Sequence, residues 1–320
     1  MKVLVTGANG FVGRPLCLRL AELDYKVAAA VRPDIPCPEG AERRKAARLG
    51  PEGDWISALL GMEAVVHLAA RVHVMHDQST DPLAEFRAAN VAGTLRLAEQ
   101  AVAAGLRHLV FLSSIKANGE ETFGTPFGPE AAAPVDPYGI SKLEAEQGLA
   151  QLARRTGLAI TVLRPPLVYG PHVKGNFRSL IGLVDRGVPL PLGLVDNRRS
   201  LIGIGNLVDA IRAVLESPPA AGATRVFTLA DGETISTAEL VRRLAAALDR
   251  PARLLPVPPA LLRLGGRLTG RSAAVQRLTA SLEVSSAAIR DTIGWTAPDG
   301  LEYGLEATAR WWRNRESQDP

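Results

Sequence analysis

Cysteine, long apolar runs and targeting segments are all scarce or absent in this sequence of 320 residues. Cys17 and Cys37 are the only cysteines, which is too few for a disulfide framework or a cysteine-based metal site and fits a reducing compartment. No apolar run reaches the roughly 18 residues that a membrane span needs. The N-terminus shows no charged segment followed by an apolar segment and a cleavage site. We therefore expect a cytoplasmic protein with no metal and no membrane span.

The sequence also lacks a basic tail and any strip in which arginines alternate with aromatic residues, so nucleic acid is not an expected partner. The net charge of +4 indicates either an anionic ligand or simply an arginine-rich composition, and composition alone favours the second interpretation. Hydrophobic residues at 47% and charged residues at 22% are typical of a globular protein. The length suits one large α/β domain or two domains that share a core.

A glycine-rich turn near the start of the chain points to a dinucleotide. Residues 3–5 form a short apolar run, typical of a buried parallel strand, and residues 15–20 continue with a helical pattern. Between them, Gly7 permits a tight turn, Gly10 lets a pyrophosphate approach backbone N–H groups, and Gly13 permits close packing of helix and strand. The G-x-x-G-x-x-G spacing at the start of a strand-helix unit favours a cofactor site over a plain turn.

The next strand predicts which cofactor. Residues 27–31 read as the second strand, and Arg32 follows where NAD-selective sites commonly place an acidic residue, with Asp34 only later. A guanidinium suits a 2′-phosphate, so NADP is favoured and NAD remains possible. A short third strand is expected near the charged run 42–49, which we interpret as a solvated face.

Residues 64–70 predict an apolar strand that ends in small side chains. His67 has no accompanying metal ligands, so we interpret it as a hydrogen-bonded structural histidine. His73 and His76 lie in a loop and receive no role. Asn90 opens the helical run 91–104, and its plain role is helix surface or cap.

Ser113 and Ser114 follow the apolar strand 109–112, at the end that faces the ligand crevice in a doubly wound sheet. Ser114 is therefore a candidate to hydrogen-bond a substrate oxygen, although Ser113 is an alternative. A loop rich in glycine and proline follows, and a helix begins at Tyr138.

Tyr138 and Lys142 are four residues apart and share one helix face. An ammonium beside a phenol lowers the phenol's pKa, which makes the pair a candidate acid/base device. The spacing alone also describes an ordinary helix surface.

The second half of the chain is less regular. Residues 160–164 predict a strand, and the two prolines after it predict a rigid turn that would wall a nicotinamide pocket. Residues 189–193 look like a short strand. Arg198 and Arg199 precede an apolar strand, and they either bind a diphosphate or face solvent. The predicted fold is α/β: a Rossmann-type doubly wound parallel sheet (residues 1–170 plus about 198–230) with a smaller C-terminal α/β substrate domain (171–197 and 231–320).

Taken together, these motifs resemble the extended short-chain dehydrogenase/reductase family, also described as NAD-dependent epimerases and dehydratases. The resemblance covers nearly the whole chain and implies that Tyr138 is the catalytic acid/base, that Ser114 polarises the substrate oxygen, and that Lys142 holds the nicotinamide ribose. The implied cofactor-binding residues are Gly7, Asn9, Gly10, Phe11, Val12, Arg32, Leu68, Ala69, Ala70, Asn90, Tyr138, Lys142 and Pro165. The implied substrate-binding residues are Ser114, Asn176, Leu192 and Arg199.

The family resemblance implies a UDP-linked sugar as substrate and a homodimer formed through the helices after Asn90 and Tyr138. Residues 114–120, 176–177 and 197–200 resemble bacterial NAD(P)H-dependent 4-reductases of UDP-4-keto-6-deoxy-N-acetylglucosamine, which make UDP-N-acetylquinovosamine for surface polysaccharide such as O-antigen. A UDP-sugar 4-epimerase with retained NAD uses the same residues and stays open, as does a non-catalytic NAD(P)-sensing protein. Ile115, Lys116 and Ala117 replace the acidic pair of sugar dehydratases. Arg48 departs from the family's aspartate near the adenine.

Overall fold

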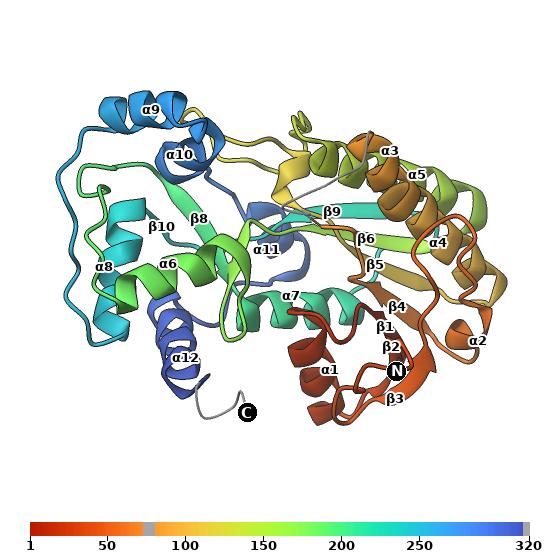
Figure 1. The fold of residues 1–320 in the computed structure, drawn as a ribbon. Helices are drawn as coiled ribbons and strands as arrows, with labels where there is room; N and C mark the ends of the chain where they lie inside the picture. The colour runs from red at the N-terminus through yellow and green to blue at the C-terminus, as the bar shows by residue number, and fades with distance from the viewer. Residues whose placement is uncertain (73–80, 316–320) are drawn as a thin grey trace.

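A seven-stranded sheet organises the structure, a computed structural model that describes residues 1–72 and 81–315. The strand order is β3-β2-β1-β4-β5-β6-β9, and every neighbouring pair is parallel (Figure 1). The strands are β1 (Lys2–Thr6), β2 (Lys26–Val31), β3 (Glu42–Lys45), β4 (Ala64–His67), β5 (His108–Leu112), β6 (Ala159–Arg164) and β9 (Thr224–Thr228). From β1 the chain adds β2 and β3 on one side of the sheet and then β4, β5 and β6 on the other side, as in a Rossmann fold. This strand order confirms the predicted fold class.

Helices cover both faces of this sheet, which is why its central strands are almost uniformly apolar. On one face, Val3, Val5 and Ala29 pack against α1 (Gly13–Glu22) and α7 (Ile204–Glu216). On the other face, α4 (Gly93–Ala103) and α5 (Pro137–Thr156) pack against the alternate side chains of the same strands. The short elements on this side are α2 (Ile56–Leu59), α3 (Pro82–Phe86), the π-helix η1 (Arg87–Ala92) and the 3-10 helix η2 (Ile115–Ala117).

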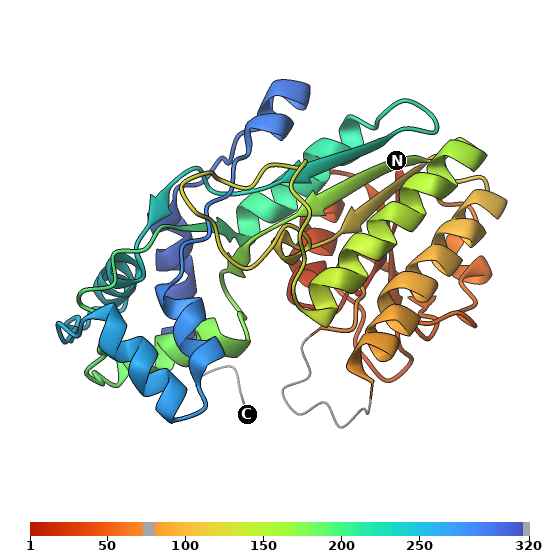
Figure 2. The same ribbon diagram turned by 90° about the horizontal axis from the view of Figure 1, so that it is seen from above.

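A smaller three-stranded sheet of order β10-β8-β7 organises the second part of the chain. Its strands are β7 (Leu167–Tyr169), β8 (Arg199–Gly203) and β10 (Thr234–Ile235). A separate core forms where this sheet meets α6 (Gly175–Asp185), α8 (Thr237–Ala247) and α12 (Leu301–Asn314). Figure 2 shows this part beside the large sheet. The domain division given above stays a proposal, and β8 places residues 199–203 in the smaller sheet.

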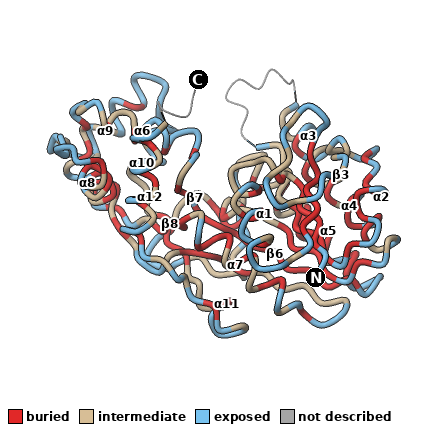
Figure 3. Tube along the Cα trace, turned by 90° about the horizontal axis from the view of Figure 1, so that it is seen from below, coloured by how far each residue is buried: buried red, intermediate tan, exposed pale blue. Residues whose placement is uncertain are grey.

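Three further helices complete the C-terminal part: α9 (Pro259–Leu268), α10 (Ser272–Thr279) and α11 (Ala287–Ile293). Helices α9 and α10 form a hairpin at one end of the molecule, where most of the trace is exposed or intermediate (Figure 3). Among residues 1–72 and 81–315, no helix is long and apolar enough to cross a membrane.

The structure differs from some of the local predictions and confirms others. Residues 189–193 are not a strand: only Leu190 forms a single bridge, to Leu254, and turns follow it. The charged run contains the expected third strand, β3, whose side chains are largely exposed because it lies at the sheet edge. His73 and His76 lie outside the described residues.

Candidate active site

The turn between β1 and α1 forms a backbone cradle at the carboxyl edge of the large sheet. Gly7 has a φ of +65°, which glycine adopts without strain. A Cβ on Gly13 would lie 2.2 Å from the Gly7 carbonyl oxygen, so α1 approaches the turn more closely than a larger residue allows. Val12, which precedes α1, makes no side-chain cap hydrogen bond, and such a helix start suits a pyrophosphate. The turn, which also contains Asn9, Gly10 and Phe11, therefore fits a dinucleotide.

The ends of β2 and β4 flank this cradle. Arg32 and Asp34 follow β2, and both are exposed, so a guanidinium and a carboxylate lie close together in sequence at the predicted adenosine end. Residues 68–70 follow β4, and the Ala69 N–H donates a hydrogen bond of 3.3 Å to Thr6 Oγ1. A Cβ on Gly7 would lie 2.9 Å from the Ala69 nitrogen. Small residues on both sides thus shape the switch point, where ligands bind in open α/β sheets.

His67 is a structural residue, as the sequence predicted. Its Nδ1 lies 2.7 Å from Thr6 Oγ1, and its Nε2 lies 3.1 Å from Thr94 Oγ1. Burial, assisted by the charge of Lys142, lowers the pKa of His67 to about 3, so the ring stays neutral.

Asn90 is not a helix-surface or capping residue, and that interpretation is wrong. It is 1% exposed and lies inside the π-helix η1. Its side chain accepts the Arg71 N–H at 2.8 Å and donates to the Arg71 carbonyl at 3.0 Å and to Ser141 Oγ at 3.1 Å. Asn90 therefore ties the chain after β4 to α5, next to Lys142.

Ser114 lies two residues beyond the end of β5, at the edge where the sequence predicted it. Its hydroxyl accepts the Lys116 N–H at 3.2 Å, which caps η2, and it lies close enough to the phenol of Tyr138 to lower the pKa of that phenol. The Ser113 hydroxyl instead donates to the buried Glu146 carboxylate. Ser114 is thus the serine that contacts the phenol.

Tyr138 lies in the first turn of α5, where its position is fixed by the helix cap. Asp136 Oδ1 accepts the Gly139 N–H at 2.6 Å, and the other carboxylate oxygen pairs with the Lys116 ammonium. A Cβ on Gly139 would lie 2.5 Å from the Lys116 carbonyl oxygen, so the start of α5 packs directly on η2. This close packing brings the phenol to Ser114.

The expectation that the phenol of Tyr138 has a lowered pKa is wrong for this structure. Burial raises the pKa of Tyr138 to about 12, Asp136 adds to the rise, and the hydrogen bond with Ser114 opposes it. Lys142 is 1% exposed, and its ammonium lies 4.1 Å from the centre of the Phe111 ring. Burial lowers the pKa of Lys142 to about 7, against the attraction of Glu146. The phenol is therefore neutral at pH 7.

A buried ion pair lies behind these hydroxyls. Arg164, at the end of β6, donates to both oxygens of Glu146 on α5, with Nε–O distances of 3.0 and 3.1 Å. The same guanidinium donates to Asn118 Oδ1 at 3.1 Å and to the carbonyls of Pro129 and Ala131 at 3.1 and 3.0 Å. The pair thus connects β6, α5 and the loop between Ser114 and Tyr138.

The predicted substrate residues Asn176, Leu192 and Arg199 line one cavity of about 440 Å³. The Arg199 guanidinium donates to the Ala280 carbonyl at 3.3 Å, and burial lowers its pKa while Glu120 opposes this. Arg277 of α10 supplies a second guanidinium. The other walls are largely apolar and include Leu167, Phe177, Leu180, Leu183, Leu240, Leu262, Val275 and Leu278.

A short stretch of chain links this cavity to the hydroxyls of Ser114 and Tyr138. Leu167 lines the cavity, and Pro165, two residues earlier, accepts the Ile115 N–H at 2.9 Å. Ile115 directly follows Ser114, so this cavity and the hydroxyls of Ser114 and Tyr138 share one backbone connection.

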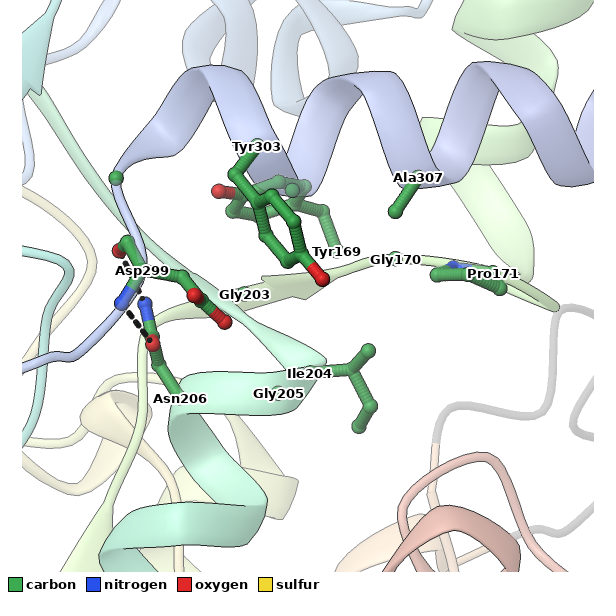
Figure 4. Close-up of a pocket in the computed structure, with 12 residues that line it drawn as sticks. Tyr169, Gly170, Pro171, Gly203, Ile204, Gly205, Asn206, Asp299, Tyr303 and Ala307 are labelled. Atoms are coloured by element: carbon green, nitrogen blue, oxygen red, sulfur yellow. Dashed lines mark hydrogen bonds between the residues drawn. The ribbon is translucent and has the colours of Figure 1, made fainter.

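A second cavity, of about 180 Å³, lies between the starts of α7 and α12 (Figure 4). Asn206 donates to the Asp299 carbonyl at 2.8 Å and accepts the Asp299 N–H at 3.0 Å. The Tyr169 hydroxyl donates to Asp231 at 2.8 Å. None of the predicted site residues lines this cavity, so we interpret it as part of the joint between the two sheets.

Sequence reasoning missed Glu146 and Arg277. Glu146 was detectable, because it lies four residues after Lys142 on the same helix face, whereas Arg277 reaches the site only through tertiary packing. Among the described residues, no group of three or more His, Cys, Asp or Glu side chains is arranged to hold a metal ion.

Comparisons with known proteins agree with this arrangement. Residues 3–230 match the NAD dependent epimerase/dehydratase family. A UDP-glucose 4-epimerase of Vibrio cholerae is 44% identical over 312 residues, which cover 96% of this chain and 94% of the relative. MoeE5, solved in complex with UDP-glucuronic acid and NAD, superposes with a TM-score of 0.78 at 26% identity and covers 98% of this chain and 100% of its own. A UDP-glucuronic acid 4-epimerase of Bacillus cereus, with a TM-score of 0.80, 20% identity and coverage of 100% and 99%, shares the fold.

Proposed function

This chain belongs to the NAD-dependent epimerase/dehydratase family, and from that premise we propose that it is a UDP-sugar 4-epimerase that retains NAD. The neighbouring side chains of Ser114 and Tyr138, at the ligand edge of a Rossmann sheet, carry the proposal. The 44% identity to a UDP-glucose 4-epimerase, over almost the full length of both chains, favours epimerisation over the 4-reductase interpretation.

In this reaction Tyr138 takes the proton of the sugar's 4-hydroxyl, while the Ser114 hydroxyl hydrogen-bonds the same oxygen. When bound in the cradle between β1 and α1, NAD would supply reversible hydride transfer at C4 of the sugar. Tyr138 then gives the proton back. Only the phenolate form of Tyr138 can take this proton, and a phenol with a pKa of about 12 is rarely ionised at pH 7, so the reaction needs nearby positive charge. Lys142, on the same helix, is the residue that would provide this charge when it is protonated.

Arg199 and Arg277 would bind the diphosphate of the substrate, and Asn176 would add a polar contact. Guanidinium groups suit this task because they donate bidentate hydrogen bonds to phosphate oxygens. The apolar walls would hold the remainder of the nucleotide sugar. Leu192 belongs to those walls.

Arg32 favours a second candidate function, that of an NADPH-dependent 4-reductase of a UDP-4-keto-6-deoxy-N-acetylhexosamine. Its guanidinium follows β2, where it is exposed, and it suits a 2′-phosphate and hence an exchangeable NADP.

The test is incubation of the purified protein with UDP-glucose, UDP-galactose and their N-acetylated forms, followed by NMR of the products and measurement of the bound cofactor. The epimerase proposal expects interconversion at C4 with no net change in nicotinamide absorbance. Stoichiometric oxidation of added NADPH by a UDP-4-keto sugar, with no interconversion, would favour the reductase. Bound cofactor with no turnover of any of these sugars would instead support a non-catalytic cofactor-sensing protein.

We further propose a homodimer formed through α4 and α5. Leu95 and Val102 of α4 remain partly exposed, which leaves apolar surface for a partner helix. A sedimentation mass of a single chain at micromolar concentration would contradict this.

A further inference from the structure

The hairpin of α9 and α10 carries an unusual combination of charge and apolar surface. Between Arg250 and Leu282 the sequence contains six arginines and no aspartate or glutamate. This segment therefore has a formal charge of +6, whereas the whole chain has +4 and the remainder thus sums to −2. The positive charge of the protein is concentrated here.

The apolar surface lies on one side of α9. Leu261, Leu264 and Leu268 are 58%, 51% and 80% exposed, and their spacing of three and four residues places them on one helix face. The opposite side is occupied, because Leu262 lines the substrate cavity and Gly266 is buried against Val275. The packed side of α9 is therefore the one that carries Leu262 and Gly266, and the side that carries the three leucines remains exposed.

The arginines flank this leucine face. Arg263 and Arg267 lie four residues apart on the neighbouring face of α9, and Arg271 follows the helix. All three are exposed, and none forms an ion pair within residues 1–72 and 81–315. A helix with exposed leucines beside unpaired arginines fits a surface that is both apolar and negatively charged.

We propose that the α9–α10 hairpin docks the protein on an anionic phospholipid bilayer. The three leucines would enter the boundary between headgroups and acyl chains, and the arginines would contact the anionic headgroups. Because the opposite side of the hairpin lines the substrate cavity, docking would bring that cavity to the membrane surface. This proposal does not depend on the epimerase assignment.

The test is cosedimentation of the full chain with vesicles of phosphatidylcholine, with and without phosphatidylglycerol. We expect binding only with phosphatidylglycerol, and release by salt. The triple variant Arg263→Gln/Arg267→Gln/Arg271→Gln should weaken binding on the order of a hundredfold, at about fivefold per arginine. The triple variant Leu261→Ser/Leu264→Ser/Leu268→Ser should weaken it at least tenfold, an order-of-magnitude expectation.

The matched control is Ile56→Ser/Leu60→Ser, which removes two apolar side chains of similar exposure, 58% and 68%, from the distant α2 and the residue that follows it. It should bind vesicles like the unmodified protein, and all variants should keep their thermal unfolding temperature. Equal binding to both vesicle types, or full binding by the leucine variant, would overturn the proposal. A leucine variant that loses self-association in the absence of vesicles would show that a second copy covers this face.

Discussion

Replacing Lys142 with methionine should make the protein more stable and less active. Lys142 is 1% exposed, and burial lowers its pKa from 10.5 to about 7. At about 1.36 kcal/mol per pKa unit, this difference means that burying the charged lysine lowers the free energy of unfolding by about 5 kcal/mol at and below pH 7. Methionine keeps a chain of similar length and removes the charge. It loses the contact with the Phe111 ring, which is worth about 1–2 kcal/mol. We therefore expect the free energy of unfolding at pH 7 to rise by about 3–4 kcal/mol.

The pH dependence has a definite sign. Between pH 7 and about 10 the unfolded chain binds more protons at this lysine than the folded protein does, so the stability of the unmodified protein rises with pH. The methionine variant lacks this contribution. Urea unfolding at pH 7 and pH 9 measures both effects, and the variant's advantage should shrink at the higher pH.

Lys116→Met is the matched control. Lys116 pairs with Glu120 at 2.9 Å and with Asp136, and these partners raise its pKa against the opposing effect of burial. Its replacement should therefore destabilise the protein. The reasoning fails if Lys142→Met is no more stable than the unmodified protein at pH 7, or if both lysine variants behave alike.

Three other substitutions test the site. Tyr138→Phe should lower kcat by about 10²–10⁴ and leave NAD content unchanged, and a normal kcat would remove the phenol from the chemistry. Gly139→Ala places a Cβ 2.5 Å from the Lys116 carbonyl oxygen, so we expect the free energy of unfolding, measured with urea, to fall by about 1–3 kcal/mol. The control Gly265→Ala, whose Cβ would have nothing within 4 Å, should be no less stable than the unmodified protein. Equal stability of the two variants would argue against the close contact at Gly139. Arg199→Met should raise KM for the UDP-sugar about 10- to 100-fold, from the loss of a charged hydrogen bond, with a smaller change in kcat; an unchanged KM would exclude Arg199 from substrate binding.

The Rossmann half was predictable because its signals are local. Each central strand is a short apolar run, and the glycine turn precedes a helix with a clear pattern. Residues that follow parallel strands must meet at one edge of the sheet, so Ser114 and the β4 end residues could be placed without coordinates. The Tyr138 helix was equally predictable, since Asp136 and Pro137 form a recognisable start.

The remaining features depend on tertiary packing. Asn90 was misjudged because a polar residue at an apparent helix start normally faces solvent, whereas η1 buries it. The pKa of Tyr138 was misjudged because spacing along a helix gives no measure of burial, and burial is the larger effect here. The pattern of the proline-rich residues 251–259 gave no indication of the helical hairpin that follows them.

The buried pair of Arg164 and Glu146 has a consequence for how this enzyme class can diversify. The pair orients the chain around Ser114 and Tyr138 from within the large-sheet domain, and neither residue lines the 440 Å³ cavity. The proposed reactive groups and the proposed recognition surface are therefore built from separate sets of side chains. New sugars can be accommodated by remodelling the walls of α6, α8 and α10, while the proton-transfer machinery is inherited unchanged.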